Sequence, residues 1–137
     1  MATTEPIKIP DELMTLIDDH LKGFNTHDND LYKSVFSDTA IVIDGIAPYR
    51  WLNPNAPANW LADVEKWHEK FGVTSENLAY ELGIWAVEGT SAYAVVSGTL
   101  TVGLNGQTMT REGLMTYTFT NYDGVWKVDS QAWARIT

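Results

Sequence analysis

The amino-acid sequence predicts an α+β fold, in which helices pack on one face of a mostly antiparallel sheet. Three observations support this prediction. In the first half of the chain, apolar residues recur at spacings of three and four, as on the buried side of an amphipathic helix. From about residue 74 the spacing changes to two, which is typical of half-buried strands. Asn105-Gly106 and Asp123-Gly124 then divide this second part into hairpins.

The first half is expected to hold three helices. The first covers about residues 11–25, because its apolar residues form one stripe. A short second helix follows over about residues 29–36, with Asp28 as its N-cap. A third helix ends at Gly72. Its apolar stripe consists of Trp60, Val64, Trp67 and Phe71.

Five strands are expected, the first of them short. Residues 40–43 read Ala-Ile-Val-Ile, and we expect this strand to be buried on both faces. The longer strands cover about residues 74–87, 91–103, 107–120 and 125–135. The chain has 137 residues without a linker or a repeat, so a single domain over 1–137 is predicted, with a loosely held start at 1–9.

The hairpin turns predict which strand residues share a face. Pairing Leu104 with Gln107 places Val96 opposite Met115. The inner face, which the helices cover, is then Ala92, Ala94, Val96, Gly98, Leu100, Met115, Tyr117, Phe119, Trp126, Val128, Ser130 and Ala132. The outer face is rich in threonine and carries Trp133. It is either a solvated surface or an interface. Because an exposed tryptophan among polar residues suggests association, we expect a homodimer through it.

Composition excludes several classes of function. With 18 acidic and 9 basic residues, the formal net charge is −9, which disfavours nucleic acid and anionic membranes as partners. The chain has no cysteine, so disulfides, thiol catalysis and thiolate metal sites are excluded. Its three histidines lack metal-ligand spacing, and no nucleotide-binding glycine motif occurs, so neither a metal nor a cofactor is expected. No signal peptide is apparent, and we expect a cytoplasmic protein.

Three segments resemble the nuclear transport factor 2-like superfamily: FNTHDNDLYKSVFSDTAIVIDG, VEGTSAYAVV and YTFTNYDGVWKVDSQAWA. The resemblance implies a cone-shaped fold, with three N-terminal helices packed on a curved, mostly antiparallel sheet that encloses a pocket. Members include ketosteroid isomerase, SnoaL-like polyketide cyclases, scytalone dehydratase and an epoxide hydrolase, as well as non-catalytic binding and assembly domains. The resemblance therefore predicts the fold and leaves the function open.

Residues 36–44 resemble ketosteroid isomerase most closely. The resemblance implies that Asp44 is the proton-abstracting base. His20 stands where that enzyme has its helix-one tyrosine, and Met115 stands where it has a protonated aspartate. Ser130 and Ala132 stand where many pocket-bearing relatives carry histidines. The chain thus keeps the base, exchanges one hydrogen-bond donor and loses the second acid.

Two residues are candidates for catalysis on their own chemistry. Asp44 directly follows an apolar strand, and burial among aromatic residues would raise its pKa and make it a general base. Alternatively, Asp44 only caps the turn at Gly45. His20 lies on the apolar stripe of the first helix, where it could donate a hydrogen bond to a ligand or simply be a core histidine.

The candidate ligand contacts are Tyr49, Trp51, Trp60, Met115, Tyr117 and Ser130. Tyr49 and Trp51 lie in the loop after the first strand and could line a pocket mouth, or Trp51 could pin the loop. Trp60 belongs to a helical stripe that is usually core. The Tyr117 hydroxyl needs a partner if it is buried. Arg111 is expected near the rim of the inner face, where an ion pair with a carboxylate is the alternative to a ligand contact.

The leading hypothesis is a cofactor-free isomerase, cyclase or dehydratase that abstracts a proton next to a carbonyl of an apolar small molecule. Asp44 would be the base, and His20 or Tyr117 would stabilise the oxyanion. One alternative is a non-catalytic ligand-binding domain, which the uncharged residues Met115, Ser130 and Ala132 favour. Another is an assembly module that recruits a partner chain through its sheet.

Overall fold

The computed structural model describes residues 7–137. Part of the segment 1–9 therefore lies outside the described residues. The elements follow in this order: α1 (Asp11–Thr26), α2 (Asn29–Ser34), β1 (Phe36–Ile43), β2 (Arg50–Trp51), α3 (Ala56–Phe71), β3 (Val73–Glu88), β4 (Ser91–Leu104), β5 (Gln107–Tyr122) and β6 (Val125–Arg135). Within residues 7–137, no helix is long and apolar enough to span a bilayer.

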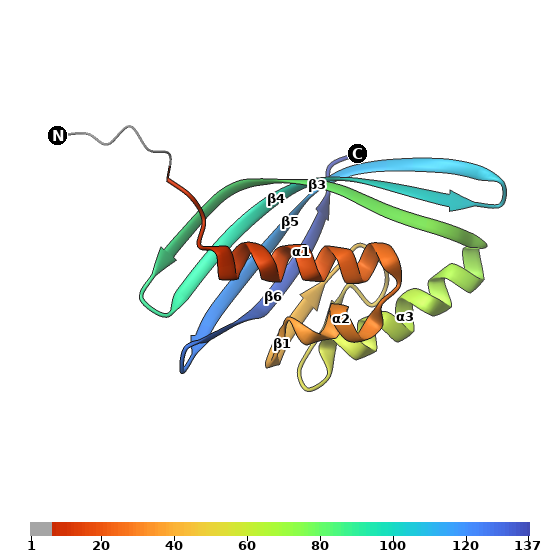
Figure 1. The fold of residues 1–137 in the computed structure, drawn as a ribbon. Coiled ribbons are helices and arrows are strands. Elements are labelled where there is room, and N and C mark those ends of the chain that lie inside the picture. The colour runs from red at the N-terminus through yellow and green to blue at the C-terminus, as the bar shows by residue number, and fades with distance from the viewer. Residues whose placement is uncertain (1–6) are drawn as a thin grey trace.

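The strands form one sheet in the order β2-β1-β6-β5-β4-β3. Neighbouring strands are antiparallel except β1 and β6, which are parallel. The sheet is curved, and the three helices lie on one side of it (Figure 1). The α+β architecture predicted from the sequence is therefore confirmed, and the space between helices and sheet is where a site can form.

The helix boundaries follow from local capping. α1 ends at Thr26, and the next residue, His27, adopts a left-handed conformation with φ of 57°. As predicted, Asp28 caps α2, and its carboxylate accepts a hydrogen bond from the backbone N–H of Leu31 at 3.1 Å. His27 and Asp28 thus form a turn and a cap.

The first strand is longer than predicted and is buried on one face only. β1 begins at Phe36, and Val42 is fully buried while Ile43 is 45% exposed. The prediction that residues 40–43 are buried on both faces is wrong, because the helices cover only one side of the sheet. The sequence also gave no signal for β2, a two-residue strand in which Trp51 pairs with Val42.

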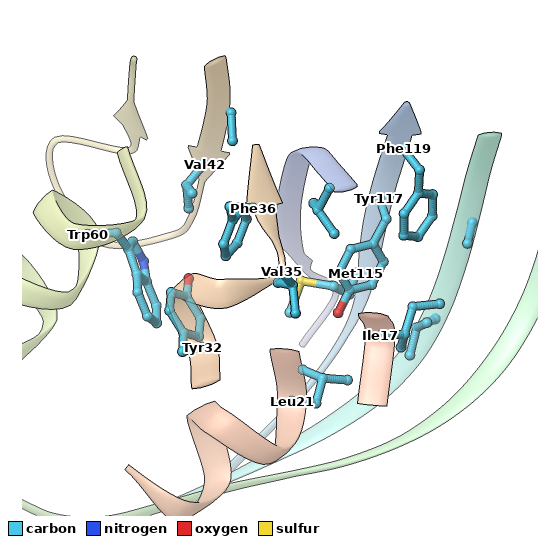
Figure 2. Close-up of a cluster of buried hydrophobic side chains, with 14 of the residues drawn as sticks. Ile17, Leu21, Tyr32, Val35, Phe36, Val42, Trp60, Met115, Tyr117 and Phe119 are labelled. Atoms are coloured by element: carbon cyan, nitrogen blue, oxygen red, sulfur yellow. The ribbon is translucent and has the colours of Figure 1, made fainter. Parts of the chain in front are cut away.

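The register of the β4–β5 hairpin is as predicted. Leu104 pairs with Gln107, Val96 with Met115, and Ala94 with Tyr117. The apolar residues of these strands face the helices and form the core. Figure 2 shows Tyr117 and Phe119 of the sheet on the same side as Ile17 and Leu21 of α1, and all four are at most 1% exposed.

In the second half of β6, the residues on the inner and outer faces are the reverse of those predicted. Phe119 pairs with Val128 but Thr118 pairs with Ser130, so Asp129 is an extra residue in β6. One extra residue exchanges the two faces of the strand beyond it. Gln131 and Trp133, predicted on the outer face, therefore lie on the inner face with Tyr117 and Met115. Ser130 and Ala132, predicted on the inner face, lie on the outer one.

Hydrogen bonds to the Asp129 carboxylate stabilise this bulge. The hydroxyls of Ser37, Thr120 and Tyr122 all donate to it. Partial burial acts to raise the pKa of Asp129, but these hydrogen bonds outweigh it and hold the pKa below its ordinary value. The bulge is thus tied to β1 and β5 by an ionised side chain.

A first testable prediction concerns Gly23, where α1 and α2 approach each other. A Cβ atom at Gly23 would stand 2.5 Å from the backbone nitrogen of Tyr32 and 2.8 Å from its Cα. Because these are backbone atoms of a buried residue, Gly23→Ala should lower the free energy of unfolding by about 1–3 kcal/mol. Urea unfolding followed by circular dichroism measures this loss. Gly45→Ala is the matched control, since nothing lies within 4 Å of its added methyl. Equal stability of the two variants would contradict the prediction.

Candidate functional site

A cavity of about 320 Å³ lies between the helices and the inner face of the sheet. Its wall is mostly apolar, with three tryptophans, Trp60, Trp67 and Trp133, and two methionines, Met109 and Met115. The polar and charged lining residues are His20, Tyr32, Asp44, Glu76, Arg111, Gln131 and Arg135. A concave apolar site with a few polar groups is the usual form of a small-molecule site, and this volume lies at the small end of the range.

Asp44 enters the cavity from the end of β1. One carboxylate oxygen accepts a hydrogen bond from the indole N–H of Trp60 at 2.8 Å, and the other accepts from the backbone N–H of Gly45 at 2.6 Å. Burial raises the pKa of Asp44 above its ordinary value, although these two hydrogen bonds act in the opposite direction. No other donor among residues 7–137 occupies the remaining lone pairs of this carboxylate, so it can accept a proton.

His20 is buried in the apolar stripe of α1 and lines the cavity. Its Nδ1 lies 2.6 Å from the Tyr117 hydroxyl. Burial lowers the pKa of His20 from 6.5 to about 3, so the ring is neutral at pH 7.

The tautomer of His20 follows from its partner. The Tyr117 side chain is fully buried, and residues 7–137 offer its hydroxyl no other hydrogen-bond partner. The hydroxyl therefore donates to Nδ1, and the ring proton is on Nε2. The Nε2–H group is a neutral donor on the wall of the cavity.

Tyr32 is a site residue that the sequence interpretation missed. Its ring stacks on Trp60, with centroids 5.1 Å apart and an interplanar angle of 17° (Figure 2). Its hydroxyl is buried and has no partner within residues 7–137. Burial, and then the nearby Asp44 carboxylate, raise the pKa of Tyr32. The available signal was the spacing of Tyr32, Val35 and Phe36 at three and four residues, which marks one buried face.

Glu76 is a second carboxyl group that the sequence interpretation missed. It lies on β3, its side chain is 7% exposed, and it is hydrogen-bonded to His68 of α3. Burial raises the pKa of Glu76, and the His68 contact acts to lower it. No pattern in the sequence links His68 to Glu76, which is eight positions away on another element.

The predicted ligand contacts divide into two groups. Trp60 and Met115 line the cavity, and the Gln131 amide donates a hydrogen bond to the Met115 sulfur. Tyr117 lies behind His20, outside the lining. Ser130 is on the outer face, where its hydroxyl bonds to that of Thr118. The bulge at Asp129 is the reason for that error.

The loop residues Tyr49 and Trp51 do not line the cavity either. Tyr49 is 61% exposed and sits in a turn, where its backbone N–H donates to the carbonyl of Ile46 at 2.8 Å. Trp51 is buried, and its indole N–H donates to Asp63 of α3 at 2.7 Å. Trp51 therefore pins the loop, which was the alternative interpretation.

The chain matches no protein-family model and no curated protein. Solved structures with the same architecture include the hexachlorocyclohexane dehydrochlorinase LinA type 3 from Novosphingobium barchaimii, at 16% identity and a TM-score of 0.79, covering 92% of this chain and 85% of that one. A ketosteroid isomerase-like protein from Erwinia carotovora atroseptica has 14% identity and a TM-score of 0.78, covering 92% and 95%. A nuclear transport factor 2-like superfamily protein from Salmonella enterica has 16% identity and a TM-score of 0.74, covering 92% and 89%. The chain therefore has the nuclear transport factor 2-like fold, as its sequence predicted.

Proposed function

We propose that the protein binds a mostly apolar small molecule in this cavity and abstracts a proton next to a carbonyl, with Asp44 as the general base. The observation that carries the proposal is a carboxylate of raised pKa on an apolar wall, near the Tyr32 hydroxyl, which has no hydrogen-bond partner among residues 7–137. A base and a neutral donor in one mostly apolar cavity are what enolate formation requires.

In the proposed step, a C–H bond next to the substrate carbonyl breaks and its proton moves to the Asp44 carboxylate. The electron pair forms the enolate C=C bond, and negative charge develops on the carbonyl oxygen. His20 Nε2–H and Tyr32 O–H are two neutral donors of lining residues, and we assign the stabilisation of this oxygen to them. Tyr117 acts through His20 as a positioning residue, since its hydroxyl donates to Nδ1. Return of the proton to another carbon gives isomerisation, whereas loss of a leaving group gives elimination.

Two structural neighbours support this class of reaction by their names, a dehydrochlorinase and a ketosteroid isomerase-like protein. Dehydrochlorination removes a proton and chloride, and isomerisation of a ketone moves a proton. Both reactions can use one carboxylate base, which fits the single catalytic carboxylate proposed for this chain.

The proposal is tested first by ligand binding. Planar phenols and enones are titrated into wild type and Asp44→Asn while tryptophan fluorescence is recorded, since Trp60, Trp67 and Trp133 line the cavity. Saturable binding that changes about tenfold on Asp44→Asn, which corresponds to about 1.4 kcal/mol, supports a working base in the cavity. Failure of every phenol and enone to bind wild type would contradict the proposal.

The alternative is a non-catalytic ligand-binding protein of the same fold. Met115 favours it, because the resemblance to ketosteroid isomerase puts an acid at that position and here the Gln131 amide bonds the sulfur. This alternative expects saturable binding that is indifferent to Asp44→Asn and no turnover of any bound ketone.

A second testable prediction uses the Trp60 hydrogen bond. Because that bond lowers the pKa of Asp44, Trp60→Phe should raise it further. The acidic limb of the kcat/KM profile, which reports the base in the free enzyme, should then move to higher pH. The control is Trp67→Phe, a lining tryptophan of the same helix that does not bond Asp44. A limb that shifts equally in both variants would contradict this assignment.

We also propose a homodimer through the outer sheet face, with a changed set of residues. Trp133 lies on the inner face and so does not support this dimer. The outer face still exposes three large apolar side chains, Ile43, Tyr93 and Leu114, at 45%, 40% and 39%. Light scattering coupled to size exclusion should give twice the 15.3 kDa chain mass. Leu114→Glu should give the chain mass alone, because a charge within an apolar interface opposes association. A monomeric wild type at micromolar concentration would refute the dimer.

A further inference from the structure

Two arginines line the cavity of this strongly acidic chain. Arg111 lies on β5 and Arg135 at the end of β6. Arg135 pairs with Gly113, which is two residues from Arg111, so both side chains project from adjacent strands on the inner face. Arg111 is partly buried, whereas Arg135 is exposed at the rim.

The Arg111 guanidinium has an unused side. Its Nη1 donates to the backbone carbonyl of Thr110 at 3.1 Å. Its Nε is buried and has no hydrogen-bond partner in the part of the chain that the structure describes. Nε–H and Nη2–H point the same way in a planar guanidinium and form the fork that binds two carboxylate oxygens.

Residues 7–137 supply no carboxylate for this fork. Among residues 7–137, the recorded ion pairs are Lys33–Asp30, Lys66–Asp63 and His68–Glu76, and none involves an arginine. The alternative expectation for Arg111, an ion pair with one of the abundant carboxylates, is therefore not met. A buried donor without a partner is costly, so a carboxylate from outside the chain would relieve this cost once the Arg111 side chain turns to expose Nε to the cavity.

The two carboxyl groups of the cavity do not neutralise the arginines. An adjacent guanidinium would hold the pKa of a carboxyl group down. The pKa values of Asp44 and Glu76 are both raised, and no arginine is among the groups that act on them. The base and the fork therefore serve different parts of a ligand.

The wall next to Arg111 is flat and aromatic. The Trp133 ring lies against Gly113, where an added Cβ atom would stand 2.7 Å from two of the ring carbons. Glycine at this position leaves room for the indole on the sheet. A planar apolar body can pack on this wall with its polar end at Arg111.

We infer that the ligand of this cavity carries a carboxylate on a planar apolar body, and that the Arg111 fork binds the carboxylate, with Arg135 beside it at the rim. The inference rests on the proposed function, because it names the substrate class of the same cavity. The net charge of −9 repels anions at long range. A preference for a carboxylate must therefore come from these local guanidinium groups.

The test compares trans-cinnamate with cinnamamide, which share a planar body and differ in the charged group. Isothermal titration calorimetry of wild type should give a Kd for cinnamate at least tenfold below that for cinnamamide. Arg111→Gln should bring the two Kd values within about threefold, mainly by weakening cinnamate. Arg50→Gln is the matched control, since it removes the same charge from an exposed residue outside the cavity lining. It should keep the preference.

A second variant at Arg111 distinguishes loss of the carboxylate-binding fork from loss of the fold. Arg111→Lys keeps the charge but removes the fork, and it should retain only part of the preference. Equal binding of the two compounds to wild type would overturn the inference while leaving a ligand-binding cavity. Loss of the preference in Arg50→Gln would overturn it as well, because net charge would then be the cause. If neither compound binds wild type, the inference fails, and the titration with phenols and enones decides the proposed function separately.

Discussion

Replacement of Asp44 by asparagine is expected to lower kcat by about 10²–10⁴-fold, the usual contribution of a positioned general base. Asparagine has nearly the same shape and its amide oxygen can still accept the Trp60 N–H, but it cannot take up a proton. The measurement is the ultraviolet absorbance that appears when β,γ-unsaturated ketones, with and without a carboxylate, become conjugated.

The chain offers a close control for this variant. Asp63 also accepts an indole N–H, from Trp51 at 2.7 Å, and it does not line the cavity. Asp63→Asn should therefore keep the turnover of wild type. An Asp44→Asn protein that is as active as Asp63→Asn would remove Asp44 from the mechanism. Binding without turnover in wild type would favour the non-catalytic alternative.

The parts of the fold that depend on local chemistry could be predicted from the sequence. The Asn105-Gly106 turn determines the pairing of β4 with β5, since a two-residue hairpin fixes the register, and every predicted pair is found. The Asp28 cap and the apolar stripe of α1 are also local features. The arrangement of these elements in space was predicted from the resemblance to the superfamily.

The faces of β6 could not be predicted in the same way. The bulge at Asp129 depends on Ser37, which is 92 positions away in the chain, and on two residues of β5. An aspartate inside a strand is unfavourable and was the one local signal. Because one extra residue exchanges the faces, it moved Ser130 out of the cavity and brought Trp133 and Gln131 into it.

The candidate site was predicted only where a residue type was informative by itself. Asp44 and His20 both line the cavity, and each was informative by itself, since one follows an apolar strand and the other interrupts an apolar stripe. Glu76 and Tyr32 were missed because their role arises from burial and from partners distant in the chain. The partner of His20, Tyr117, is 97 positions away and no spacing connects the two.

Acidification should reveal how deeply His20 is buried. The pKa of His20 is about 3 in the folded protein and 6.5 without burial. At a pH between these two values, His20 is protonated in the unfolded chain and neutral in the folded chain. The contribution of His20 to the free energy of unfolding is therefore at its full value above pH 6.5, and it decreases as the pH falls towards 3. At pH 4.5, two units below the unfolded pKa, the loss should be about 2–3 kcal/mol.

Urea unfolding followed by circular dichroism at pH 7.0, 5.5 and 4.5 measures this loss in wild type and in His20→Gln. Glutamine does not titrate, so the variant should lose about 2–3 kcal/mol less than wild type over this range, whatever its stability at pH 7. Asp44 and Glu76, whose raised pKa values act in the opposite direction on acidification, are present in both proteins and cancel in the difference. His27→Asn removes an exposed histidine at a left-handed position that asparagine tolerates, and it should follow wild type. Parallel pH curves for wild type and His20→Gln would mean that His20 is hydrated in solution. Its neutral Nε2–H could then no longer be counted as a donor in the cavity.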